Sequence, residues 1–125
     1  MVGIKAFGAY LPRRRLQRSV IAEANCWFDP SLKGLSKGER TMCSWDEDSI
    51  TMGVEAAQDL CGLDDKIQAI ILASTTLPFA VRQNAGIIAE ALNLHNNIRT
   101  MDIGGSLRAS TTSLLTALDI ASAQG

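Results

Sequence analysis

The chain has 125 residues, of which 46% are hydrophobic and 20% are charged, a composition typical of a globular domain. Its formal net charge of −1 excludes the strong positive field that attracts nucleic acid or an anionic membrane surface. No run of 18 apolar residues is present, and the first residues, MVGIKAFGAY, lack the apolar stretch and cleavage site of a secretory signal. We therefore expect a cytoplasmic protein that binds neither nucleic acid nor membrane.

The cysteines and the single histidine limit the chemistry that the chain can perform alone. Cys26, Cys43 and Cys61 are odd in number and far apart, which fits neither a disulfide framework nor a CxxC metal site. We expect reduced thiols that pack within their segments, and no metal site. With His95 as the only histidine, a His-rich metal centre or a complete Ser-His-Asp triad is nearly excluded.

The first third of the sequence predicts a strand, a helix and a loop. Residues 2–9 alternate in the manner of a strand that ends at Pro12. The basic run at residues 13–15 is interpreted as a solvated loop rather than a phosphate contact. Residues 18–26 carry apolar positions at helical spacing, and residues 29–40 are rich in Gly, Ser, Lys and Pro, which predicts a loop.

A helix and a buried strand follow. The stretch from Ser44 to Glu47 has the S-x-x-E form of a capping box, so a helix is expected to begin there and to end at Gly62. Residues 67–73, IQAIILA, form the short apolar run of a buried parallel strand. The expected inward stripe of the helix consists of Ile50, Val54, Ala57 and Cys61.

The last third predicts helix, strand and helix. Residues 83–92 place Ile87, Ile88 and Leu92 on one helical face, and residues 98–103 alternate as a strand. Gly104-Gly105-Ser106 is a tight turn, without a phosphate-binding pattern, into a helix over residues 107–123. The small residues of that helix are typical of burial between close neighbours.

The predicted order is strand, helix, helix, strand, helix, strand, helix, which indicates a parallel α/β sheet with right-handed crossovers. Three strands make an incomplete sheet. The last helix has nothing after it that would bury it, so we expect residues 1–125 to be part of a larger domain.

Three stretches, GIKAFGAYLPRRRL, KGLSKGERTMCSWDEDSITMGVEAAQDL and STTLPFAVRQNAGIIAEALNL, resemble the first half of hydroxymethylglutaryl-CoA synthases and, more distantly, ketoacyl-ACP synthase III, both of the thiolase superfamily. The resemblance covers essentially all 125 residues. It implies a thiolase-like α/β fold, with a parallel-rich sheet and a buried central helix, of which this chain supplies the first three strands of the N-terminal half. It also implies a homo-oligomer, with strand 98–103 at the interface. Its most specific parts are Asp46-Glu47-Asp48 with Thr51-Met52, Glu55-Ala56-Ala57, and Pro78-Phe79-Ala80-Val81.

In this superfamily, the resemblance implies, a cysteine at the start of the helix after the third strand accepts the acyl group from a thioester. The family places it five residues after an aspartate, and the same count from Asp102 reaches Leu107, which cannot form an acyl-enzyme. The family's acid/base glutamate corresponds to Thr75. Ser106 is a weak candidate for a substitute nucleophile, because an alcohol needs a nearby base to become nucleophilic and His95 is the only candidate base in the sequence.

The resemblance also places the loop over residues 29–40 near CoA. Lys33 and Arg40 are therefore candidates for contacting a CoA phosphate. Trp27 either stacks on the adenine or packs within the protein, and both alternatives stay open. A coenzyme A thioester is the expected substrate, and no covalently bound cofactor is expected.

Two functions are consistent with these residues. The first is a hydroxymethylglutaryl-CoA-synthase-like acyltransferase or condensing protein that binds acyl-CoA but is inactive alone. The second is a non-catalytic scaffold or dimerisation subunit that pairs with a second copy or with a thiolase-like partner subunit. Loss of both Cys and Glu favours the second, while CoA binding, which needs no nucleophile, leaves the first open.

Overall fold

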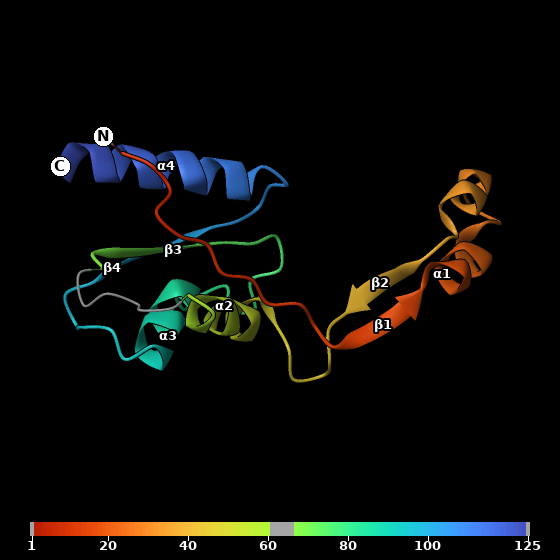
Figure 1. The fold of residues 1–125 in the computed structure, drawn as a ribbon, viewed down its shortest axis with the longest axis horizontal. Coiled ribbons are helices and arrows are strands. Elements are labelled where there is room, and N and C mark those ends of the chain that lie inside the picture. The colour runs from red at the N-terminus through yellow and green to blue at the C-terminus, as the bar shows by residue number, and fades with distance from the viewer. Residues whose placement is uncertain (1, 61–66, 125) are drawn as a thin grey trace. The chain divides into compact units, whose positions relative to one another are not determined.

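The structure, a computed structural model, describes residues 2–60 and 67–124 (Figure 1). The chain divides into one unit formed by Met1–Tyr10 with Asp48–Gly125 and a second formed by Leu11–Glu47. No helix in the described ranges is long and apolar enough to cross a membrane.

The unit Leu11–Glu47 is built on an antiparallel pair of strands in which Leu16 lies opposite Arg40. The Arg18 N–H donates to the Gly38 carbonyl at 2.9 Å, which extends the ladder to the first residue of the following helix. The elements of this unit are, in chain order, β1 (Arg14–Gln17), α1 (Arg18–Asn25), the 3-10 helix η1 (Pro30–Leu35) and β2 (Glu39–Met42).

Helix α1 confirms the predicted helix, but the two loops predicted around it are wrong. The basic run at 13–15 enters β1, and the stretch 29–40 contains η1 and the start of β2. A strand whose partner lies more than 20 residues away leaves little signal in the local sequence. The 3-10 helix η1 forms because Pro30 has a fixed φ that suits the first helical position, and because the Asp29 carboxylate accepts from the Ser31 N–H at 3.0 Å. Cys26 is a half-buried free thiol, whereas Cys43 is exposed and does not pack inside.

The other unit has strands β3 and β4 paired in parallel, with Ala69 opposite Arg99 and Ala73 opposite Ile103. Helices α2 and α3 pack together on one face of this pair and α4 lies on the other face (Figure 1). This parallel α/β arrangement confirms the predicted fold class. The bounds are α2 (Ser49–Gln58), β3 (Ala69–Ala73), α3 (Asn84–Ala91), β4 (Arg99–Ile103) and α4 (Ala109–Gln124).

The core of this unit lies between the helices and the two strands. Ile88 is 4% exposed and faces inward as predicted, and a Cβ added at Gly53 would come within 3.0 Å of its Cδ1 atom. Helices α2 and α3 therefore approach closely where Gly53 has no side chain. Cys61 and Gly62 of the predicted stripe and stop lie outside the described residues. The buried apolar residues are Ile50, Ala85, Ile88, Ala89 and Ala109.

The strand predicted over residues 2–9 is wrong. The segment pairs with no strand in the described part of the chain, and its polar groups turn to α2 instead. The Ala9 N–H donates to the Asp59 carboxylate at 3.1 Å, and Gly8 lies against α2 so closely that a Cβ would overlap the Ala56 carbonyl. Because a strand needs a ladder partner, alternation alone is not sufficient. Its large apolar side chains, Val2, Ile4 and Phe7, are exposed.

Helix α2 begins at Ser49 rather than at Ser44. The Asp48 carboxylate accepts from two backbone N–H groups of the first turn at 2.9 and 2.8 Å, and the Thr51 hydroxyl accepts from the Asp48 N–H at 2.8 Å. The expected S-x-x-E contact does form, since the Ser44 N–H donates to the Glu47 carboxylate at 2.6 Å, but it closes a turn ahead of the helix. The true capping box therefore lies four residues further on.

Helix α4 is covered on one side within this chain. It contacts β3 and β4, and Ala109 at its start is buried. Leu114 and Leu115 are 47% and 58% exposed, so the opposite face of the helix is open.

Candidate functional site

The loops that follow β3 and β4 meet at one edge of the parallel pair. The Ser74 N–H donates to the Ile103 carbonyl at 3.1 Å, and a Cβ added at Gly104 would lie 3.2 Å from both the Ser74 carbonyl and the Leu77 side chain. Any side chain at position 104 would push these loops apart. Ligands of open α/β sheets bind at the carboxyl ends of the strands, so this edge is the candidate functional site.

A buried hydrogen-bond network supports this edge and was not found from the sequence. Asp102 of β4 accepts from the Asn84 N–H at 2.7 Å, the Asn84 side chain at 2.9 Å and the Ala85 N–H at 2.7 Å. Asn84 is 1% exposed, donates to the Phe79 carbonyl at 2.9 Å and accepts from the Phe79 N–H at 3.1 Å. Asp102 thus caps α3 from the neighbouring strand and, through Asn84, holds the loop after β3.

Thr100 gives the network a second attachment. Gln83 donates from its side chain to the Thr100 carbonyl at 2.6 Å, and the Thr100 hydroxyl donates back to the Gln83 side chain at 2.6 Å. Thr100 and Asp102 are two residues apart on β4, so they share one face of the strand. Two polar residues at alternate positions of the predicted strand were the signal in the sequence.

Hydrogen bonding keeps Asp102 ionised. Burial raises the pKa of its carboxyl group, but the hydrogen bonds from the Asn84 side chain and from the Asn84 and Ala85 N–H groups outweigh burial and leave the pKa below its ordinary value of 3.8. The positive end of the α3 dipole favours the same charge. A carboxylate with a lowered pKa and its oxygens occupied holds structure and is a poor general base near neutral pH.

Ser106 and Leu107 lie in the turn between β4 and α4. The Ser106 hydroxyl oxygen accepts from the Arg108 N–H at 3.1 Å and its carbonyl accepts from the Ala109 N–H at 3.0 Å, so Ser106 closes the turn that leads into α4. Leu107 is 95% exposed at the same turn. His95 lies in the connection that leads into β4, where its Nε2 is 3.0 Å from the Ile67 carbonyl. That is the amino end of the strands, so His95 cannot activate Ser106.

Thr75 is exposed in the other loop of this edge. Next to it the Ser74 hydroxyl oxygen accepts from the Thr76 N–H at 3.0 Å, and the Ser49 hydroxyl donates to the Thr76 carbonyl at 3.1 Å. The structure therefore brings the loops that carry Thr75, Ser106 and Leu107 to one edge, with no acid or base among these three side chains.

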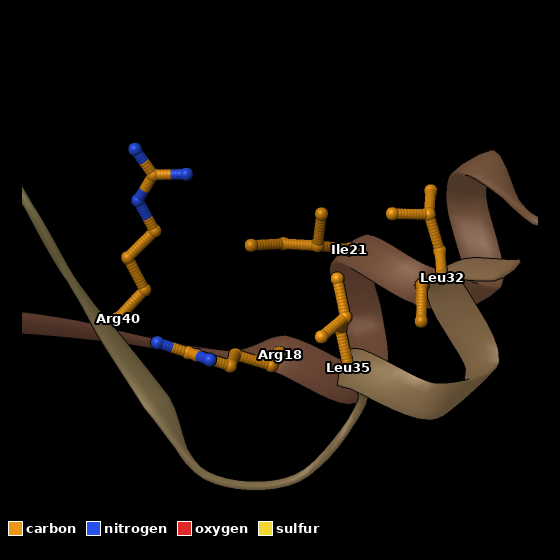
Figure 2. Close-up of a pocket in the computed structure, with 6 residues that line it drawn as sticks. Arg18, Ile21, Leu32, Leu35 and Arg40 are labelled. Atoms are coloured by element: carbon orange, nitrogen blue, oxygen red, sulfur yellow. The ribbon is translucent and has the colours of Figure 1, made fainter. Parts of the chain in front are cut away.

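The residues predicted to bind CoA all belong to the unit Leu11–Glu47. Figure 2 shows Arg40 with Arg18 at one end of a groove of about 290 Å³ between α1 and η1. Lys33 lines a separate hollow of about 250 Å³. Trp27 is 83% exposed and forms an edge-to-face pair with Phe28, with ring centres 5.9 Å apart.

Comparison with known sequences finds relatives that match nearly the whole of this chain. No family model matches the sequence. The hydroxymethylglutaryl-CoA synthase of Methanocella arvoryzae is 34% identical over 125 residues, which cover 95% of this chain and 35% of that protein. The synthase of Aeropyrum pernix is also 34% identical, over 94% of this chain and 34% of its own length. This chain is a relative of the hydroxymethylglutaryl-CoA synthases.

Solved structures agree with the sequence relatives. The ketoacyl-ACP synthase III of Thermus thermophilus matches 98% of this chain and 39% of its own with a TM-score of 0.82 at 22% identity, which shows the thiolase-like fold. MvaS in complex with 3-hydroxy-3-methylglutaryl coenzyme A matches with a TM-score of 0.79 at 26% identity, over 98% of this chain and 31% of that one. The predicted resemblance is confirmed. This hydroxymethylglutaryl-CoA synthase relative spans about a third of the length of the proteins it matches, which fits an N-terminal portion of their fold.

Proposed function

We propose that residues 1–125 form the N-terminal part of a hydroxymethylglutaryl-CoA-synthase-like acyltransferase or condensing protein, and that this part binds acyl-CoA without forming an acyl-enzyme. The observation that carries the proposal is Leu107, 95% exposed at the turn into α4. A thiol there would benefit from the helix N-terminus, whereas an isobutyl group has no atom that attacks a thioester.

The surroundings of Leu107 support the same conclusion. The Thr75 hydroxyl cannot act as a general base near neutral pH. The Ser106 hydroxyl oxygen accepts from the Arg108 N–H in the turn ahead of α4, and Ser106 is far from His95 along the strands. Asp102 is occupied by three hydrogen bonds from α3. Catalysis therefore requires residues outside this chain.

Binding of a CoA thioester is supported by the unit Leu11–Glu47. Arg40 and Lys33 line neighbouring hollows and Trp27 is exposed, which suits an anionic ligand with an aromatic base. MvaS, which matches this chain, was solved with 3-hydroxy-3-methylglutaryl coenzyme A bound. The ligand is a freely exchanging substrate in the cytoplasm, and no covalent cofactor takes part.

A second function, a non-catalytic scaffold or dimerisation subunit, is favoured by the open face of α4. Leu114 and Leu115 are half exposed on a helix whose other face covers the sheet. A second copy or a thiolase-like partner subunit would bury these side chains.

Mass spectrometry after incubation with acetyl-CoA tests the missing nucleophile. We expect no acetyl adduct on the wild-type protein and saturable CoA binding by calorimetry. An adduct on Ser106 contradicts the proposal, and CoA binding that cannot be detected leaves the scaffold function, which light scattering would show as an oligomer.

The variant Leu107→Cys tests the position itself. Its thiol should react with iodoacetamide faster than Leu114→Cys, which places a thiol on the same helix away from the N-terminus, because the dipole stabilises the thiolate at the first turn only. Equal rates for the two variants would remove position 107 as the site of the family nucleophile.

A further inference from the structure

The two loops at the candidate functional edge are joined by a closed set of contacts that begins and ends on β4. The Asp102 carboxylate accepts from the Asn84 N–H at 2.7 Å and from the Asn84 side chain at 2.9 Å. The Asn84 side chain in turn donates to the Phe79 carbonyl at 2.9 Å and accepts from the Phe79 N–H at 3.1 Å. Because Asn84 is 1% exposed, water does not compete for these bonds. Asp102 therefore holds the loop after β3 firmly at Phe79.

Leu77 returns the contacts to β4. It is joined to Phe79 through Pro78, whose ring fixes its φ and stiffens this part of the loop. The half-buried Leu77 side chain lies against Gly104, where its Cδ1 would be 3.2 Å from an added Cβ. Gly104 is two residues after Asp102 and begins the turn into α4. A movement of the loop after β3 is therefore passed to that turn.

The first of these contacts requires a carboxylate. The two Asp102 oxygens accept from three N–H donors, two on Asn84 and one on Ala85, and an ionised carboxylate is an acceptor only. An asparagine at position 102 has the same shape but would place an NH2 group against at least one of these donors. The variant Asp102→Asn should therefore release Asn84 and the loop that Asn84 holds.

We propose that Asp102 is a positioning residue for the candidate site, which through Asn84 and Leu77 holds the turn that carries Leu107. Its oxygens are occupied by α3, so it acts on the site only through other residues. It does so from the face of the strands that α3 covers, whereas the turn leads to α4 on the other face (Figure 1). This inference rests on the proposed function, in which position 107 is the site of the family nucleophile.

The alkylation of Leu107→Cys by iodoacetamide as a function of pH reports the position of the turn. Trypsin cuts at Arg99 and Arg108, so mass spectrometry reads position 107 in a peptide without any native cysteine. Adding Asp102→Asn should slow alkylation at pH 7 about threefold and move the pH–rate profile upward, because the sulfur is no longer held at the N-terminal end of α4. Loss of a nearby negative charge alone would favour the thiolate and speed the reaction. The sign therefore separates positioning from a direct effect of the charge.

A second variant disturbs the same contacts at their other end and leaves the charge in place. Gly104→Ala puts a Cβ 3.2 Å from both the Leu77 side chain and the Ser74 carbonyl, so the loop and the turn must separate. Combined with Leu107→Cys, it should also slow alkylation and move the profile upward. Gly86→Ala is the matched control, because its Cβ has 3.9 Å to the nearest atom, and it should leave the profile unchanged.

The outcomes separate this inference from the proposed function. If Leu107→Cys reacts no faster than Leu114→Cys in the otherwise unchanged chain, the proposed site at position 107 fails. If it reacts faster, but neither Asp102→Asn nor Gly104→Ala slows it, the positioning role fails and the site stands. Asp102→Asn should leave the alkylation of Leu114→Cys unchanged, and an equal change at positions 107 and 114 would mean a general loosening and overturn the proposal. Where circular dichroism shows that Asp102→Asn has unfolded, Gly104→Ala decides the question.

Discussion

The two units of this chain are stabilised by different means. Buried apolar side chains in the described residues are concentrated in the unit that holds the parallel strands, and Leu11–Glu47 contributes Pro12 and Ala22. The latter unit relies on the β1–β2 ladder and local caps, and it leaves Trp27 and Phe28 at 83% and 79% exposure. Burial of apolar area is the main source of stability, so one unit has the core while the other leaves its large aromatic side chains exposed.

Charge is divided in the same way. Leu11–Glu47 contains seven Lys or Arg and five Asp or Glu, a net charge of +2, whereas the rest of the chain contains five and eight, a net charge of −3. The overall value of −1 conceals this division. A nearly neutral chain can therefore still present a local cationic surface to an anionic ligand.

The largest difference between the units should appear when the same kind of side chain is shortened in each. Ile88→Ala removes a side chain that is 4% exposed and should lower the free energy of unfolding by about 3 kcal/mol. Leu35→Ala, at a position 62% exposed, should cost less than about 0.5 kcal/mol. Urea unfolding measures both. Equal losses would show that Leu35 is packed as well as Ile88, against the difference drawn between the two units.

A smaller effect is expected at the buried network. Asp102→Asn keeps the shape of the side chain but loses the charge that accepts from Asn84 and Ala85, and should cost about 2 kcal/mol. Because the folded pKa of Asp102 lies below 3.8, the unfolded state takes up a proton first as pH falls. The contribution of the Asp102 charge to the free energy of unfolding is therefore complete at pH values above the ordinary carboxyl pKa, and it is lost as pH falls through the lowered pKa of the folded state.

Urea unfolding of wild type and Asp102→Asn between about pH 2 and pH 6 checks that sign. The two curves should converge at the acid end. Asp119→Asn, at an exposed position of α4, is the matched control and should follow the wild type throughout. A gap between wild type and Asp102→Asn that persists at the lowest pH would contradict the role given to the charge.

The smallest effect concerns the start of α2. Asp48→Ala removes the side chain that accepts from the Ile50 and Thr51 N–H groups and should cost about 1 kcal/mol. Asp48→Ser, which restores an acceptor, should recover most of it. Ser44→Ala should leave the helix content measured by circular dichroism unchanged, since Ser44 lies ahead of the helix. Fraying of α2 in Ser44→Ala would instead support the helix start predicted from the sequence.

The elements that were predicted well have boundaries marked by residues close to them in the sequence. β3, α3 and β4 fall inside their predicted ranges, because apolar spacing and the flanking Asn, Gly and Pro residues act over a few positions. The strand at residues 2–9 and the loop at 29–40 were wrong because strand formation depends on a partner. β2 pairs with β1 across 22 to 28 residues, and residues 2–9 have no partner strand in the described ranges.

The sequence by itself determined the parallel α/β class, the resemblance to thiolase-like proteins and the absence of a thiol at position 107, since each depends on local spacing or residue identity. The tertiary structure decided that Asp102 caps α3 from 18 residues away, that His95 and Ser106 lie at opposite ends of the strands, and that Arg18 and Arg40 share one groove. These relations depend on contacts between distant segments, whose register the amino-acid pattern of either segment does not specify.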